Sequence, residues 1–274
     1  MASVDDSVAR YVHGYAPAEQ GRLIAQAEFW RDRLILGGTA LTDGTRLLEI
    51  GCGAGAGLGI LGGAFPGVQL TGVDIEPRQV AAARAHLTGR GLEADLRVAD
   101  GRRLPFADGS FDHLWMMWLL EHLTEDDAIA VLREAERVLV PGGTITAIEA
   151  DYATVKFGPP SPPLESLRSA LLQTMRAFGQ GDAGTQLWGW LDEAGFAGIE
   201  PGERLFSYRG PEVGPVARYL ADAIAATLSE IASLPGRPDQ ETLRRGLEDL
   251  QALDRHPGAW LRFVIHKAQA RSPG

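Results

Sequence analysis

Glycine occupies every second position in a short stretch that directly follows an apolar run. The run is Thr45–Ile50, and the glycines stand at 51, 53, 55 and 57. A residue without a Cβ atom lets the backbone turn tightly and lets a ligand lie against it. Residues 56–65 then have the composition of a helix. The segment therefore predicts a strand, a tight turn and a helix whose N-terminus faces a ligand.

Strand and helix patterns go on alternating along the chain. Further strands are expected at 69–73, 94–98, 111–117, 143–150, 199–208 and 260–269, with helices at 77–90, 125–140, 164–178 and 185–194. Such alternation favours a parallel sheet covered by helices on both faces. We predict an α/β, Rossmann-like, mostly parallel seven-stranded sheet with a helical N-terminal extension and a helical insertion near the C-terminus.

The expected organisation has three parts. Residues 1–44 form a helical N-terminal lid, 45–156 the Rossmann-like core, and 157–274 complete the sheet and carry a helical cap at about 211–256. Four of the 16 prolines gather at 157–163, which marks the boundary between the second and third parts. The helical cap is expected either to roof a pocket or to join two subunits into a homo-oligomer.

Composition excludes several classes of function. The net charge of -10 opposes binding to nucleic acid or to an anionic membrane surface. The apolar runs, such as 114–120, are shorter than the roughly 20 residues that cross a bilayer, and the acidic start lacks a secretory signal. The single cysteine, Cys52, forms no internal disulfide. A cytoplasmic protein without membrane or nucleic-acid partners is expected.

Acidic residues stand at the ends of the first three predicted strands. Asp74 suits a ribose, and Asp100 suits the amino group of an adenine. Glu49 precedes the glycines, where its charge favours a ligand with ammonium or sulfonium groups and repels a pyrophosphate. Gly51, Gly53 and Ala56 also fit the looser dinucleotide pattern, so an NAD(P)-dependent oxidoreductase stays open as an alternative.

Five segments in this order resemble motifs of the class I S-adenosylmethionine-dependent methyltransferases, especially small-molecule enzymes related to ubiquinone and menaquinone biosynthesis. The resemblance covers about residues 45–150 and rests on Glu49–Gly55, Val73–Ile75, Asp100–Phe106, Phe111–Asp112 and Arg137–Gly143. It implies a methyltransferase that uses S-adenosyl-L-methionine on a small-molecule acceptor, in the setting of specialised metabolism. A catalytically silent protein that binds the same cofactor is a further alternative.

The resemblance also implies roles for single residues. The glycines would line the amino acid and ribose of the cofactor, and acids and neighbouring residues would bind the ribose, the adenine and the sulfonium. An aromatic residue of the N-terminal lid, Tyr11 or Tyr15, would close over the bound cofactor. The expected cofactor-binding set is Tyr15, Glu49, Gly51, Gly53, Gly55, Asp74, Ile75, Asp100, Gly101, Arg102, Met116 and Met117.

Candidates for proton transfer follow the fourth predicted strand. Glu121 and His122 lie on the expected ligand side of the sheet, and His122 is the better titratable group. Glu149, Asp151 and Tyr152 end the fifth strand at the same edge and would bind a cationic or hydroxylated acceptor. Each of these residues also has an ordinary structural interpretation.

Two further features receive a structural interpretation. Asp126–Asp127 suits the first turn of a helix better than a metal site, so no metal is predicted. Aromatic residues of the C-terminal part are expected mainly in the core, although they would also suit a pocket for an apolar acceptor. These residues are Phe157, Phe178, Trp188, Trp190, Phe206, Tyr208 and Tyr219.

Overall fold

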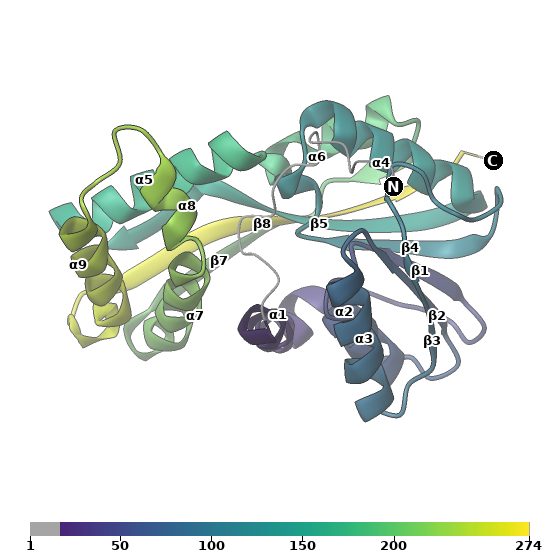
Figure 1. Ribbon diagram of the computed structural model, residues 1–274, viewed down its shortest axis with the longest axis horizontal. Helices are drawn as coiled ribbons and strands as arrows, with labels where there is room; N and C mark the ends of the chain where they lie inside the picture. The colour runs from purple at the N-terminus through teal and green to yellow at the C-terminus, as the bar shows by residue number, and fades with distance from the viewer. Residues whose placement is uncertain (1–16, 274) are drawn as a thin grey trace.

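The computed structural model describes residues 17–273, and its centre is one twisted sheet (Figure 1). Five strands run parallel in the order β3-β2-β1-β4-β5. The last strand, β8, lies antiparallel beside β5, and β6 and β7 pair with its other edge. The bounds are β1 Arg46–Ile50, β2 Gln69–Asp74, β3 Ala94–Val98, β4 Phe111–Met117, β5 Leu139–Gly158, β6 Ala197–Glu200, β7 Glu203–Arg209 and β8 Trp260–Arg271.

This architecture confirms the predicted mostly parallel α/β fold and argues against the dinucleotide alternative. Dinucleotide-binding sheets place their sixth strand next to the fifth in the order 3-2-1-4-5-6. Here the antiparallel β8 separates β5 from β6 and β7. In the described residues the sheet has eight strands instead of seven, because Pro201 and Gly202 divide the strand predicted at 199–208.

Helices cover both faces of the sheet because alternate residues of each strand point to opposite sides. Leu47 and Trp115 belong to the core shared with α1, α2 and α3, whereas Leu48 and Leu114 belong to the core shared with α4 and α6. The helices are α1 Pro17–Trp30, α2 Ala56–Ala64, α3 Pro77–Gly89, α4 Glu125–Val138, α5 Pro162–Phe178, α6 Ala183–Glu193, α7 Val213–Ala225, α8 Leu228–Ser233 and α9 Gln240–Gln251.

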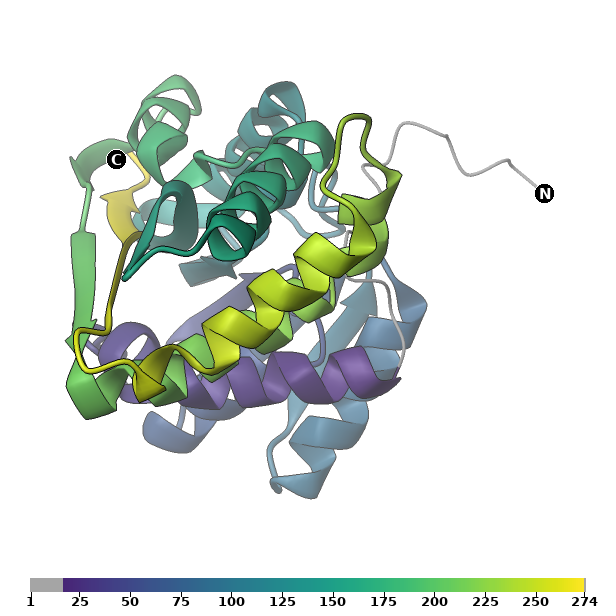
Figure 2. The ribbon, with the colours of Figure 1, turned by 90° about the vertical axis from the view of Figure 1, so that its left-hand side faces the viewer.

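Strands β5 and β8 are longer than predicted and project beyond the parallel strands (Figure 1). Their pairing continues from Thr144 to Gly158 across an irregularity between Asp151 and Lys156. Helices α5, α7 and α9 pack around the projecting end, and Figure 2 shows α9 lying across this group. The predicted insertion therefore forms a helical layer over the extended part of the sheet.

A buried lysine fixes the C-terminal end of the N-terminal helical segment. The segment continues from α1 through a wide helical turn, Arg31–Ile35. Lys267 of β8 donates hydrogen bonds from Nζ to the carbonyl oxygens of Leu34, Ile35 and Gly37 at 2.8–3.1 Å. A cation at this place satisfies carbonyl groups that the helix leaves without partners. The N-terminal helix is thus held against the end of the sheet.

Candidate functional site

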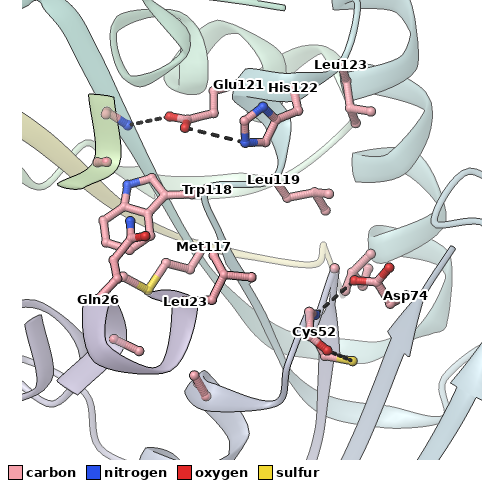
Figure 3. Close-up of a pocket in the computed structure, with 18 of the residues that line it drawn as sticks. Leu23, Gln26, Cys52, Asp74, Met117, Trp118, Leu119, Glu121, His122 and Leu123 are labelled. Atoms are coloured by element: carbon pink, nitrogen blue, oxygen red, sulfur yellow. Dashed lines mark hydrogen bonds and ion pairs between the residues drawn. The ribbon is translucent and has the colours of Figure 1, made fainter. Parts of the chain in front are cut away.

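A cavity of about 280 Å³ opens at the carboxyl ends of the parallel strands. Its walls come from the turn after β1, the ends of β2 and β4, and helices α1, α5 and α7. Figure 3 shows side chains from α1, from the turn after β1 and from the ends of β2 and β4 around this cavity. Most of the predicted site residues lie in this cavity.

The glycine turn after β1 has a left-handed backbone. Gly51, Gly53 and Gly55 have φ angles of 73°, 50° and 76°, which residues with a Cβ atom rarely adopt. The first two line the cavity, but Gly55 does not. A Cβ atom at Gly55 would lie 3.0 Å from Ala83, so Gly55 is required for the close contact between α2 and α3.

Glu49 is buried behind the glycine turn. Its Oε2 accepts a hydrogen bond of 3.0 Å from the amide of Leu58 in the first turn of α2. Burial raises the pKa of Glu49 to about 8, and the neighbouring charge of Asp74 contributes to the rise. Glu49 also lines the cavity, so a positively charged ligand there would favour its ionised form.

Asp74 holds the turn and faces the cavity at the end of β2. One carboxylate oxygen accepts from the amide of Gly53, the other from the amide of Glu76, each at 2.9 Å. A carboxylate oxygen has two lone pairs, so each oxygen retains one for a further donor. Burial raises the pKa of Asp74. Ile75, which follows, is 44% exposed and lines the same wall.

Asp100 and Arg102 form an ion pair at the next part of the rim. Arg102 donates to both oxygens of Asp100, with the shortest distance 2.8 Å, and it also donates to Asp127 at 2.8 Å. The guanidinium lowers the pKa of Asp100. Gly101 and Arg102 line the cavity with Asp100, and Asp127 belongs to the first turn of α4 as predicted.

The end of β4 directs neighbouring residues to different places. Met116 is fully buried in the core, whereas Met117 lines the cavity. Trp118 also lines it and has a φ of 53°, a conformation that costs a non-glycine residue about 1–3 kcal/mol. Sequence reasoning did not select Trp118, because no glycine or asparagine marks this position as left-handed.

A buried carboxylate organises the turn that carries the catalytic candidates. Glu149 accepts hydrogen bonds from the amides of Leu119, Leu120 and Glu121, at 3.1, 2.8 and 3.2 Å. Glu149 does not line the cavity and is fully buried. Burial and the charge of Glu121 raise its pKa well above the usual range. In this structure Glu149 therefore supports the turn and lies away from the wall.

Glu121 and His122 lie together at the upper wall of the cavity (Figure 3). Tyr152 donates a hydrogen bond of 2.9 Å from Oη to Glu121 Oε1, and His122 Nε2 lies 3.7 Å from the same oxygen. Burial raises the pKa of Glu121 to about 7 and lowers that of His122 to about 4. At neutral pH the imidazole is uncharged, and Glu121 is the group poised to gain or lose a proton.

Helix α1 contributes Leu23 and Gln26 to the wall of the cavity (Figure 3). The aromatic lid candidates Tyr11 and Tyr15 lie outside the described residues. Among the aromatic candidates of the C-terminal part, Tyr219 of α7 lines the cavity. Phe157, Trp190 and Tyr208 are buried in the core, and Trp188 is 50% exposed.

Asp151 lines the cavity, and each of its oxygens accepts one hydrogen bond. It accepts a hydrogen bond of 2.6 Å from Thr185 Oγ1 and another from the amide of Ala153.

In residues 17–273, no group of three potential ligand side chains forms a metal site. None of the helices described there is long and apolar enough to cross a membrane.

Comparison with known proteins identifies the central part of the chain. Residues 48–147 match a family described as "Methyltransferase domain". The ubiquinone/menaquinone biosynthesis C-methyltransferase of Desulfotalea psychrophila is 30% identical over 46% of this chain and 49% of its own length. The 27-O-demethylrifamycin SV methyltransferase of Amycolatopsis mediterranei is 37% identical over 48% of each chain. The resemblance predicted from the sequence is confirmed.

Similarity in fold extends over the whole chain. The solved structure of Haemonchus contortus phosphoethanolamine N-methyltransferase 2, a complex with S-adenosyl-L-methionine, is 18% identical with a TM-score of 0.56. The match covers 100% of this chain and 61% of that one. The chain itself spans about half the length of the curated relatives it matches.

Proposed function

We propose that this chain, whose residues 48–147 match the methyltransferase domain, is an S-adenosyl-L-methionine-dependent methyltransferase that acts on a small-molecule acceptor. The observation that carries the proposal is the gathering of Glu49, Asp74 and Asp100 around one glycine turn. The charges of Asp74 and Asp100, and that of Glu49 once a bound cation favours its ionised form, complement a cationic nucleoside and would repel a pyrophosphate.

The residues present fit this cofactor. Each oxygen of Asp74 keeps a lone pair for a ribose hydroxyl, and Gly51 and Gly53 leave room for the ligand beside the backbone. Ile75 offers an apolar surface to the adenine, and Arg102 holds Asp100 at its edge. Bound there, the cofactor supplies a methyl group on a positively charged sulfur.

Glu121 is proposed as the group that receives a proton from the acceptor. It faces the cavity, and its pKa of about 7 matches the pH at which a general base works well. His122 is uncharged, so we assign it to contact with the acceptor and to shaping the wall. Met117 and Trp118 border the region between the cofactor and the acceptor, where alignment of the reacting atoms supplies much of the acceleration.

The proposal includes the remaining expectations from the sequence. They are a cytoplasmic location, no nucleic-acid or membrane partner, no metal, and an acceptor of specialised metabolism. Supporting features are the net charge of -10 and, for the acceptor, the similarity to a rifamycin methyltransferase. The proposal leaves the homo-oligomeric state open.

Methyl transfer is tested with cofactor that carries a labelled methyl group and a panel of small-molecule acceptors. We expect label in an acceptor with wild-type protein and at least a roughly 100-fold lower rate with Glu121→Gln, which matches the usual contribution of a general base. Binding of S-adenosylhomocysteine is measured in parallel. Binding without transfer to any acceptor would favour the catalytically silent alternative, and tight NADH binding would favour the oxidoreductase.

A further inference from the structure

The cavity continues past the end of β4 into a region with apolar walls. This region, the acceptor chamber, is lined by α5, α7 and the projecting part of β8, which Figure 1 shows at the same end of the sheet. Five of the six side chains that define it are buried, and Ala223 is partly buried. The six are Leu171, Met175, Ala223, Ile224, Phe263 and Ile265.

Polar groups gather at one end of the acceptor chamber, next to the turn after β4. Glu121 is held there by the phenol of Tyr152, and His122 lies beside it. The carboxylate accepts hydrogen bonds from Tyr152 and from the amide of Ala150, and it retains lone pairs for a hydroxyl group. A ligand in the chamber would therefore meet apolar side chains along its body and one carboxylate at its tip.

Cations in the wall are already matched with acids. In the described part of the chain, Arg22 and Arg102 are the basic side chains, apart from His122, that line the cavity. Arg22 pairs with Glu19 at 2.6 Å, and Arg102 pairs with Asp100 and Asp127. An anionic acceptor would lose its hydration here without a counter-charge, which disfavours its binding. A cationic group would meet the carboxylate of Glu121 as a counter-charge, so the wall of the chamber discriminates mainly against anions.

We propose that the acceptor chamber binds a largely apolar molecule without negative charge that presents a single hydroxyl group to Glu121. This inference rests on the proposed methyltransferase function. The hydroxyl oxygen forms a bond to the methyl carbon while the carbon–sulfur bond breaks and the sulfur keeps the electron pair. The hydroxyl proton passes to the carboxylate of Glu121, so atoms and charges balance.

Two probes with the same apolar body test the charge preference. Para-octylphenol and para-octylbenzoate differ only in the group they present. Calorimetry on protein saturated with S-adenosylhomocysteine should give the phenol an affinity about 10-fold or more above that of the benzoate, because an unpaired buried charge beside Glu121 is costly. Equal or tighter binding of the benzoate, or no binding of the phenol, overturns the inference.

Substitutions at two alanines of α7 test where para-octylphenol binds. Ala223 lines the chamber, whereas Ala225 is exposed on the same helix. Ala223→Phe should weaken binding of para-octylphenol about 10-fold by filling the chamber, and Ala225→Phe should leave it unchanged. Equal affinity in both variants places the probe elsewhere and contradicts the inference. Both variants should bind S-adenosylhomocysteine like the wild type; a wild type that fails to bind it contradicts the proposed function instead.

Discussion

Tyr152 and Glu121, 31 residues apart in the sequence, share a hydrogen bond of 2.9 Å at the wall of the cavity. Tyr152 belongs to the extended part of β5, and Glu121 to the short turn after β4. The phenol orients the carboxylate, while burial keeps its pKa near neutrality. This pairing makes proton transfer at Glu121 the part of the proposed mechanism that responds most directly to pH.

The rate of methyl transfer should therefore rise with pH and level off above about pH 7. Glu121 accepts a proton only in its ionised form, and its pKa of about 7 lies above the ordinary value because of burial. With the cofactor saturating, so that ionisation of Glu49 does not contribute, we expect kcat/KM for the acceptor to show this single rise and Glu121→Gln to remove it. His122→Asn serves as control, because a pKa of about 4 leaves the imidazole uncharged over the same range. If kcat/KM still rises with pH in Glu121→Gln, another group acts as the base.

Glu149 should act as a positioning residue. Its carboxylate accepts from three successive amides, and Gln at this place offers an NH₂ group where one of them now donates. We expect Glu149→Gln to lower the free energy of unfolding by about 1–3 kcal/mol and to reduce kcat more than cofactor affinity. The exposed Glu200→Gln is the control. A kcat equal to that of the wild type would limit Glu149 to a structural role.

The two lysines of the chain provide a matched test of the helix anchor. Lys267 is buried with its ammonium against the carbonyl groups after α1, and Lys156 is exposed on β5. Lys267→Met should lower the free energy of unfolding by about 1–3 kcal/mol, because buried carbonyl oxygens lose their donor. Lys156→Met should have little effect. Similar denaturation midpoints for the two variants would contradict the anchoring role.

Cofactor binding should release a proton from Glu49. Its pKa of about 8 leaves the carboxyl largely protonated at pH 7, and a bound cation favours the ionised form. Calorimetry in buffers with different ionisation enthalpies should detect release of up to about one proton. Affinity should consequently rise with pH up to about pH 8. S-adenosylmethionine, which carries the sulfonium charge, should release more than S-adenosylhomocysteine, and Glu49→Gln should abolish the release.

Periodicity and glycine placement predicted the features that depend on local sequence. Most of the strands, the tight glycine turn and the positions of Asp74 and Asp100 at or just after strand ends follow from short-range patterns. The sequence did not predict features that depend on contacts between distant segments. Gly55 is one example, because it is required by its contact with Ala83 of another helix.

The end of β4 illustrates the same limit within the site. Strand alternation buries Met116, and the left-handed backbone of Trp118 then redirects the chain into the turn that Glu149 holds. That turn depends on a carboxylate from β5, so residues near Glu121 do not reveal it. The length of β5 likewise depends on pairing with β8, more than 100 residues later.

The central claim is that acids at the strand ends bind a cationic nucleoside, and titration of S-adenosylmethionine by calorimetry tests it most directly. Wild-type protein should bind, Asp74→Ala should weaken binding by about 1–3 kcal/mol, and the exposed Asp95→Ala should match the wild type, with folding of each variant checked by circular dichroism. No binding by the wild type, or equal affinity in Asp74→Ala, would contradict the account.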